Sequence, residues 1–422
     1  MFSRRSLAFG AAAAGLIAPW AARAQTPIGA EQRLWLEGRY LPHYLDLQQG
    51  AAAGDAMARS MLSQYAAFLG DEATALGVHE QPRDPAASLP DLTGAEARDA
   101  MEDILGRAAG ARVVILNEAH NVSGHRAFAA RVMRALRPLG FDVFAAETFA
   151  PPQPVPSPDI AGYRRGAPFH SGYGYYTFDP VYAETVREAA RLGYRFAAYE
   201  QAWDQNAPDD APALEQIARR EQAQAENLKR RVLDQDPAAR VFVFCGYSHA
   251  MEEPGRGGAW FAARLKEMTG IDPLTIEQSG NWPATRPEHD APHVAAVLDR
   301  FAPTAPVAVS RNGESFASTT YAGQMDLSVF HPRLAPVGGR PGWLAADPER
   351  RAIEVDVPAF EGPALLQAMW AGEGSAGIPA DQFLLTPRQA RATLFLHPGS
   401  YFLRLETVEG ILGAYGEIEV AA

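Results

Sequence analysis

This 422-residue chain has one cysteine and fewer basic than acidic residues. The single cysteine, Cys245, excludes an internal disulfide, and because it follows an apolar run we expect a small buried residue there rather than a nucleophile. Asp and Glu (50) outnumber Lys and Arg (38), and the net charge of -12 argues against nucleic acid or an anionic membrane as a partner. No glycine-rich phosphate loop occurs, so nothing supports a nucleotide cofactor.

The N-terminus has the pattern of an export signal. Arg4 and Arg5 form a twin-arginine element, small and apolar residues fill 8–19, and residues 22–24 (Ala-Arg-Ala) fit the rule for cleavage. We therefore expect residues 1–24 to be a signal peptide and the mature protein to be periplasmic. The apolar run is too short to span a bilayer, so no membrane span is expected in the mature chain.

Between residues 111 and 311, apolar strands alternate with amphipathic helices. The expected strands are 112–117, 141–147, 194–200, 240–245, 273–277 and 307–310, and the expected helices are 123–137, 180–191, 211–234, 257–268 and 294–300. Alternation at this spacing produces right-handed βαβ units. We therefore predict an α/β domain over 111–311, with a mainly parallel sheet and helices on both faces.

The two ends of the chain differ from this central part. Residues 25–110 are predicted to be a helical extension, because apolar side chains recur there at helix spacing, and residues 95–108 form its last predicted helix. Residues 340–422 contain alternating segments such as 352–357, separated by turn signals. They predict a small antiparallel β-sandwich. Because it contains no cluster of ligand residues, we expect a scaffolding or interaction role for it.

Four consecutive predicted strands end on carboxylate or imidazole side chains. The first ends on Glu118, followed by His120, the second on Glu147 and the third on Glu200, and the fourth runs into His249. In an open parallel sheet, groups just past the carboxyl ends of the strands face one crevice, where ligands bind. This pattern predicts a site for general acid–base or metal-assisted chemistry. A capping or ion-pairing role is the alternative at each position.

Substrate contacts are predicted around the same edge. His125 begins the helix after the first strand, whereas Tyr173 and Arg164 lie in the long loop 151–179, which is rich in Tyr and Arg. A loop of this length in an α/β domain is usually a lid or a substrate wall, and an ordered surface flap is the alternative. We predict that His125, Tyr173, Arg164 and Glu200 bind substrate.

These motifs resemble those of the superfamily that joins the erythromycin esterase-like proteins, the ChaN-like haem-binding proteins and the Tiki proteases. Residues 115–120 (Ile-Leu-Asn-Glu-Ala-His) are similar to its opening strand with Gly-Glu-x-His, Glu147 to its second strand end, and residues 246–249 (Gly-Tyr-Ser-His) to its later Gly-x-x-His. Residues 220–227 are similar to the helix before that last strand. The resemblance covers about 110–280 of the sequence.

Two departures from the superfamily pattern bear on function. Asn117 replaces the usual Gly, and Arg126 follows His125 where ChaN-like members tend to carry paired histidines. The second departure weighs against haem binding.

Together, the residues and the resemblance predict a hydrolase of an ester, lactone or amide in a small-molecule substrate. His120 would activate water as a general base oriented by Glu118. Glu147 and His249 would complete the acid–base set, or all four would bind a divalent metal such as Zn, Mn or Fe. A non-catalytic haem- or metal-binding protein is the second hypothesis, and an inactive scaffold with a working β-sandwich is the third. The sequence does not indicate an oligomeric state.

Overall fold

The computed structural model describes Leu34 and residues 37–151, 159–254, 258–318, 320–375 and 377–421. The expected signal peptide, residues 1–24, lies outside the described residues. The centre of the molecule is a nine-stranded sheet. Its strands are β1 (Ala95–Asp99), β2 (Val113–Glu118), β3 (Val143–Ala146), β4 (Arg195–Ala198), β5 (Val241–Gly246), β6 (Leu274–Glu277), β7 (Val307–Arg311), β8 (Glu314–Ser315) and β9 (Leu327–Phe330).

The strand order of this sheet is β1-β7-β9-β6-β2-β5-β3-β4, with β8 paired to β7. The pairs from β9 to β4 are parallel, whereas β1, β7 and β8 form an antiparallel edge. The mainly parallel sheet is confirmed. It also includes β1, β8 and β9, which lie outside the expected segment 111–311.

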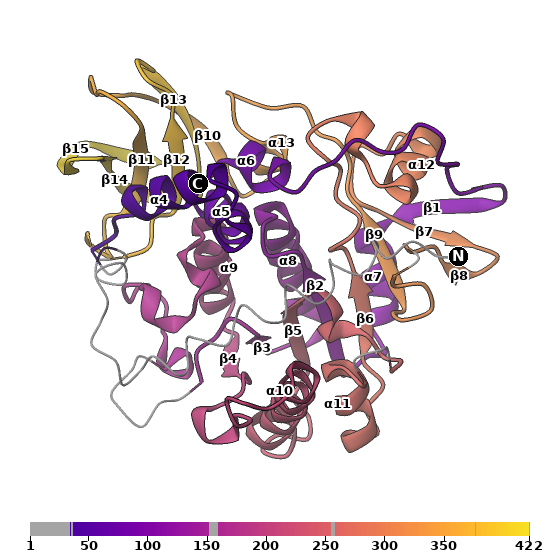
Figure 1. The fold of residues 1–422 in the computed structure, drawn as a ribbon. Helices are drawn as coiled ribbons and strands as arrows, with labels where there is room; N and C mark the ends of the chain where they lie inside the picture. Colours follow the sequence, from indigo (N-terminus) through magenta and orange to yellow (C-terminus); the bar gives the residue numbers. More distant parts are fainter. Residues whose placement is uncertain are drawn as a thin grey trace.

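Helices cover both faces of the sheet, as predicted (Figure 1). Those around the sheet are α7 (Ala100–Ala108), α8 (Ser123–Leu136), α9 (Pro180–Arg191), α10 (Ala213–Leu228), α11 (Phe261–Thr269) and α12 (Pro292–Phe301). A hydrophobic core lies on each face of the sheet. Successive residues of β2 belong to opposite cores, because the side chains of a strand point alternately to its two faces. Val114 and Leu116 pack with Phe128 of α8, whereas Val113 and Ile115 pack on the other face, with α10 and α11.

One element was predicted wrongly. The expected helix 95–108 is a strand, β1, followed by α7. β1 pairs antiparallel with β7 from Ala95 to Asp99, and Asp99 then caps α7 by accepting from the Glu102 N–H (3.0 Å). Pairing at the sheet edge therefore outweighs the helix propensity of this Ala- and Glu-containing segment.

Two antiparallel sheets follow in the last part of the chain, as expected for the β-sandwich. They have the orders β10-β13 and β12-β11-β14-β15. Val355, Leu366 and Leu403 belong to one hydrophobic cluster that joins the two sheets. The strands are β10 (Arg351–Asp356), β11 (Ala364–Trp370), β12 (Asp381–Leu385), β13 (Arg391–Leu396), β14 (Gly399–Thr407) and β15 (Gly410–Val420).

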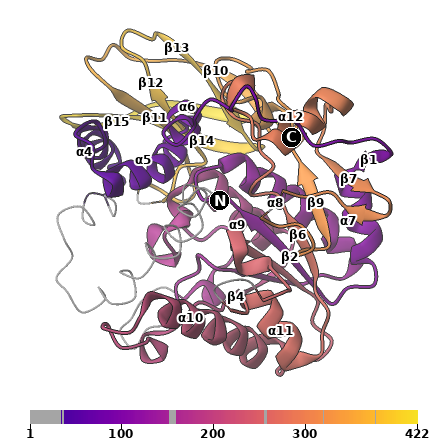
Figure 2. The same ribbon diagram turned by 45° about the vertical axis from the view of Figure 1, so that its right-hand side comes forward.

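The N-terminal helices lie beside the C-terminal sheets (Figure 2). They are α4 (Leu41–Ala52), α5 (Ala56–Phe68) and α6 (Glu72–Gly77), and the short α13 (Gly342–Ala345) precedes β10. Glu406 of β14 accepts from the Leu41 N–H at the start of α4 (3.0 Å). The C-terminal sheets also contact the central domain, where Arg187 of α9 pairs with Glu373 in the segment between β11 and β12 (2.7 Å). Among the described residues, no helix is long and apolar enough to cross a membrane.

Candidate active site

The sheet order brings the carboxyl ends of β2, β5 and β3 next to one another. β5 lies between the other two, and Glu118 at the end of β2 is in register with Gly246 at the end of β5. Glu147 directly follows β3, and its backbone N–H donates to a carbonyl of β5 (3.0 Å). His249 lies in a short helix just after β5. The residues predicted as catalytic therefore start from three neighbouring strand ends.

Glu118 and His120 form a buried pair, with exposed fractions of 2% and 4%. His120 Nδ1 lies 3.0 Å from Glu118 Oε1. Both oxygens of Glu118 also accept from the guanidinium of Arg126, so Glu118 is the acceptor and Nδ1 carries the proton. In a neutral His120 ring the proton-free nitrogen is therefore Nε2, to which no described residue donates a hydrogen bond. This is the arrangement that a general base requires.

Arg126 on α8 fixes this pair. Its Nε and Nη2 donate to the two oxygens of Glu118 (2.8 and 3.2 Å), and Nη2 also donates to the carbonyl of His120 (2.8 Å). Its Nη1 pairs with Asp179, which accepts from Ser123 Oγ (2.7 Å). Burial alone would lower the pKa of Arg126, but Glu118 and Asp179 outweigh burial and raise it. The guanidinium therefore stays charged and holds Glu118 in one orientation.

Gly246 lets His120 and Glu147 meet above β5. A Cβ atom at this position would lie 2.3 Å from His120 Cε1, 2.6 Å from His120 Nε2 and 3.1 Å from Glu147 Oε2. The Gly246 N–H itself donates to Glu147 Oε2 (2.6 Å). The absence of a side chain at Gly246 is thus what allows the imidazole and the second carboxylate to share this strand end.

His249 belongs to a second buried network, built with α10 and α11. Its Nδ1 lies 2.9 Å from Glu221 Oε2, and its Nε2 lies 3.3 Å from Glu147 Oε1 and 3.4 Å from Arg220 Nη1. Glu221 also accepts from the backbone N–H of Phe261 at the start of α11 (2.8 Å). The imidazole is therefore held between two carboxylates.

Arg220 on α10 joins Glu200 to this network. Its Nη2 donates to Glu147 Oε1 (2.6 Å), and its Nε donates to Glu200 Oε1 (3.1 Å). Gln224, one turn further along α10, donates to Glu200 Oε2 (3.0 Å). The side chain of Arg220 is 13% exposed, against 9% for His249 and 4% for Glu147. Of these three groups, Arg220 is the one that a ligand reaches most easily.

The charges around Glu147 follow from these contacts. Burial alone would lower the pKa of His249, but ion pairing with Glu147 and Glu221 raises it to about 10. Burial alone would raise the pKa of Glu147, but His249 and Arg220 hold it well below its usual range. At neutral pH, His249 is therefore a cation and is not available as a base. Burial, reinforced by Glu147, raises the pKa of the Cys245 thiol well above its usual range, which opposes a thiolate nucleophile there.

His125 lies apart from this cluster. It is fully buried, its Nδ1 accepts from the Ala119 N–H (3.1 Å), and its ring is edge-on to Trp282 (5.1 Å between centroids). Burial lowers its pKa well below the usual range, and the charge of Arg126 adds to this effect. In this structure His125 stabilises the turn after β2. Its predicted contact with substrate stays a prediction.

Two further residues predicted to bind substrate do not contact the catalytic cluster. Tyr173 packs against Phe169 and His170 (5.1 and 4.6 Å between centroids). Arg164 Nη1 donates to two carbonyls of its own loop (2.8 Å each). Glu200 does join the cluster, through Arg220.

Two tyrosines enclose the His120 ring. Tyr176, from the loop expected to form a lid or wall, stacks on it (4.2 Å between centroids, 16° between planes). Tyr247 meets the ring edge-on (4.9 Å), and its hydroxyl accepts from the His120 N–H (3.3 Å). Tyr247 has φ of 41°, a left-handed conformation that costs about 1–3 kcal/mol for a residue with a side chain. Packing must therefore hold Tyr247 in this conformation. The rings of Tyr176 and Tyr247 then leave the His120 imidazole little rotational freedom.

Sequence reasoning did not assign Arg126, Arg220 or Glu221 to the site. Arg220 and Glu221 open the segment 220–227, whose likeness to the superfamily helix was the available signal. The motif lies on α10, and only the packing of that helix over β5 shows that its two charged side chains reach the strand ends. Arg126 carried no such signal.

The charge balance of the cluster bears on the metal hypothesis. Glu118 is paired with Arg126, and Glu147 is paired with Arg220 and the protonated His249. A divalent cation would have to displace these cations, so the donor set does not fit a metal in this arrangement. Within the described part of the chain, no group of three or more His, Cys, Asp or Glu is arranged to hold a metal ion. Metal and haem binding stay predictions.

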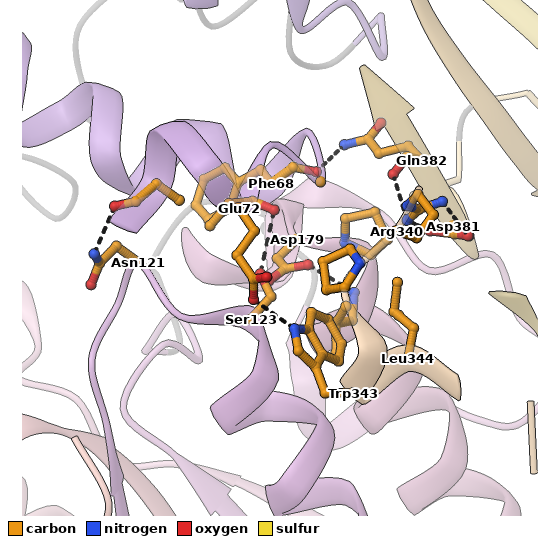
Figure 3. A pocket seen from close by; sticks show the side chains of 16 residues that line it. Phe68, Glu72, Asn121, Ser123, Asp179, Arg340, Trp343, Leu344, Asp381 and Gln382 are labelled. Atoms are coloured by element: carbon orange, nitrogen blue, oxygen red, sulfur yellow. Dashed lines mark hydrogen bonds and ion pairs between the residues drawn. The ribbon is translucent and has the colours of Figure 1, made fainter. Parts of the chain in front are cut away.

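A small cavity borders the Arg126 network at Ser123 and Asp179 (Figure 3). Its lining includes Ser123, Asp179, Glu72 and Trp343, and its volume of about 20 Å³ is enough for about one water molecule. It is too small for an organic substrate.

Replacing Gly246 by alanine is expected to disable the site. The new methyl group would overlap the His120 ring, because a Cβ would lie 2.3 Å from Cε1. We expect kcat to fall by about 10²-fold or more, the range that a general base supplies, and stability to fall by about 1–3 kcal/mol. Activity and urea-denaturation measurements check this. Gly106→Ala on α7, where a Cβ meets nothing within 4 Å, is the matched control. Equal activity in both variants would contradict the geometry.

Stability is expected to depend on pH through His249. Its pKa in the folded protein is about 10, above the ordinary 6.5, so the ion-paired proton stabilises the fold fully below pH 6.5. This contribution is lost as pH rises through 10. The difference in unfolding free energy between the wild type and His249→Gln should therefore be largest at about pH 6 and shrink towards about pH 10, by an amount on the order of a few kcal/mol. Urea denaturation of both proteins measures it, and a difference that stays constant with pH would contradict the pairing.

No protein-family model matches the chain, and no curated protein matches it in sequence. Similar solved structures include RRSP, a MARTX toxin effector domain from Vibrio vulnificus CMCP6 (17% identity, TM-score 0.30, covering 42% of this chain and 36% of that one). Another is the type III effector HopBA1 (13% identity, TM-score 0.29, covering 47% of this chain and 88% of that one). A third is the C-terminal region of Pasteurella multocida toxin (11% identity, TM-score 0.28, covering 73% of this chain and 46% of that one). The match thus spans about a third of RRSP. At these identities and scores we draw neither activity nor substrate from the likeness.

Proposed function

We propose that this protein is a hydrolase of an ester, lactone or amide, with the Glu118–His120 pair as its general base. The observation that supports this most is the His120 ring, whose Nδ1 is held by Glu118 and whose Nε2 lies at the Gly246 strand end beside Glu147. No described residue donates a hydrogen bond to Nε2, so this nitrogen can accept a proton from a water molecule. We retain export to the periplasm as part of the proposal.

In the proposed reaction, His120 Nε2 takes a proton from a water molecule while the water oxygen attacks the carbonyl carbon. The protonated ring is stabilised by Glu118, which Arg126 keeps in position. His120 then gives the proton to the leaving alcohol or amine as the carbon–heteroatom bond breaks. The products are a carboxylic acid and that alcohol or amine, so atoms and protons balance.

The negative charge that forms on the carbonyl oxygen needs a cation nearby. Arg220 is the more accessible of the two cations in the second network, and His249 beside it is protonated at neutral pH. Glu147 contacts both and fixes their positions. We therefore assign stabilisation of the oxyanion to Arg220, with His249 and Glu147 as positioning residues.

A panel of p-nitrophenyl esters, lactones and anilides tests the proposal. Hydrolysis by the wild type, and its loss in Glu118→Gln, is the expected result, because glutamine cannot balance the charge on a protonated His120. Asp103→Asn on α7, which removes a partly exposed carboxylate paired with Arg107, is the matched control. The proposal fails if no compound is hydrolysed by the wild type, or if Glu118→Gln is as active as Asp103→Asn.

A further inference from the structure

A groove of about 700 Å³ lies apart from the catalytic cluster, between α8, the segment after β6 and the segment before α13. None of Glu118, His120, Glu147 and His249 lines it. Its volume is in the range of pockets that hold small organic molecules. The groove is therefore separate from the proposed hydrolase site.

Aromatic rings form much of the lining. Trp282 lies over the first turn of α8, where a Cβ at Gly124 would be 2.1 Å from the indole. The His331 ring is 4.6 Å from the ring of Trp282 and 5.2 Å from that of Phe128. These side chains pack tightly against one another, so this wall of the groove is formed in advance and offers flat apolar surface.

Trp343 contributes to the lining from α13. Its Nε1 donates to Glu72 Oε1 (2.6 Å), as Figure 3 shows, and this hydrogen bond fixes the orientation of the indole. Trp343 and Glu72 also line the small cavity of Figure 3, so the indole separates that cavity from the groove. Two tryptophans thus belong to one groove in a chain that has seven.

Arg131 of α8 is the charged group that distinguishes this groove. It is half-buried, and no described residue forms an ion pair or hydrogen bond with its guanidinium. Its charge reaches the aromatic wall, because it contributes to lowering the pKa of His331, after the larger effect of burial, to about 3. His331 is therefore neutral and does not compete with Arg131 for an anion.

Two other charged side chains of the lining are already paired, and a third, Glu72, is partly neutral. Arg333 is bound by both oxygens of Asp290 (2.7 Å each), and Asp347 pairs with Arg134 (3.4 Å). Burial raises the pKa of Glu72 to about 7, against the smaller effect of its Trp343 hydrogen bond. The lining therefore presents one uncompensated guanidinium beside flat aromatic surface, within a protein whose net charge is -12.

We propose that this groove binds a small aromatic carboxylate, with the carboxylate on Arg131 and the ring against Trp282 and Trp343. A guanidinium presents a planar pair of donors that matches the two oxygens of a carboxylate. Aromatic side chains pack on a flat ring by stacking or edge contacts. A neutral aromatic would leave the guanidinium without a partner, whereas an aliphatic acid would leave the aromatic wall without one.

Titration of the full-length protein with 2-naphthoate, followed by tryptophan fluorescence and by calorimetry, tests this proposal. Saturable binding is expected, and Arg131→Gln should weaken it by about 10-fold or more, the range for loss of a charge-assisted hydrogen bond. The affinity of Arg131→Lys should lie between those of the wild type and Arg131→Gln, because an ammonium keeps the charge and loses the paired donors. Arg107→Gln, which removes an exposed cation on α7, should bind like the wild type.

The neutral analogue 2-naphthamide separates charge recognition from simple burial of a ring. It should bind weakly, and equally well to the wild type and Arg131→Gln. The proposal is overturned if 2-naphthoate does not bind saturably, if the amide binds as tightly as the acid, or if Arg131→Gln binds like the wild type. Circular dichroism and thermal melting of each variant confirm that it is folded.

Discussion

Replacing His120 by glutamine is expected to lower kcat by roughly 10²- to 10⁴-fold, the contribution of a positioned general base. Glutamine keeps a polar group at this place but cannot accept and release the proton of water. KM should change much less, because His120 is assigned to proton transfer rather than to binding. Steady-state kinetics on the best substrate of the ester, lactone and anilide panel measure both constants.

A matched variant tests whether this loss is specific to the catalytic histidine. His289 is also paired with a glutamate, Glu80 (2.9 Å), but it lies outside the strand-end cluster. His289→Gln should leave kcat close to that of the wild type. A His120→Gln enzyme that retains more than about a tenth of wild-type kcat would contradict the assigned role, since a general base supplies at least this much.

Replacing Arg126 by methionine is expected to lower the free energy of unfolding by about 3–5 kcal/mol, the usual cost of removing one partner from a buried ion pair. Arg126 is fully buried, and its loss would leave the carboxylates of Glu118 and Asp179 buried without their cation. Methionine fills much of the same space, so the loss measures charge pairing more than packing. Urea denaturation, with the wild type in parallel, measures the difference.

Arg107→Met is the control for this experiment, because Arg107 pairs with Asp103 on an exposed part of α7. Exposed pairs contribute about 0–1 kcal/mol, so this variant should be close to the wild type. An Arg126→Met protein less than about 1 kcal/mol below the control would show that the Arg126 network does not hold the site together.

The convergence of the candidate site could be predicted from the sequence because it follows from one rule. Strands that alternate with helices become parallel, and parallel strands end at one edge. Glu118, His120, Glu147 and His249 were placed at strand ends from the apolar runs alone, and the structure connects them within two hydrogen-bonded networks. Glu200 followed from the same reasoning, and it is joined through Arg220.

Other features depend on packing that the sequence does not encode locally. The order in which strands pair does not follow chain order, so the insertion of β5 between β2 and β3, which makes Gly246 the centre of the site, was not predicted. Arg126 and Arg220 extend long, flexible side chains to the site from α8 and α10, and their position in the sequence does not show where the guanidinium groups lie. Residues 95–99 were assigned to a helix because their own propensity favours one, whereas long-range pairing with β7 decides their structure.

The hydrolysis rate of metal-free protein tests the central claim most directly. The protein would be purified, dialysed against a chelator, checked by elemental analysis and by absorption in the Soret region, and then assayed on its best substrate. Catalysis by Glu118 and His120 predicts that kcat is unchanged by the chelator and that no haem band is present. Activity that disappears with the metal and returns with Zn²⁺, Mn²⁺ or Fe²⁺ would contradict it, as would a protein that binds haem and hydrolyses nothing.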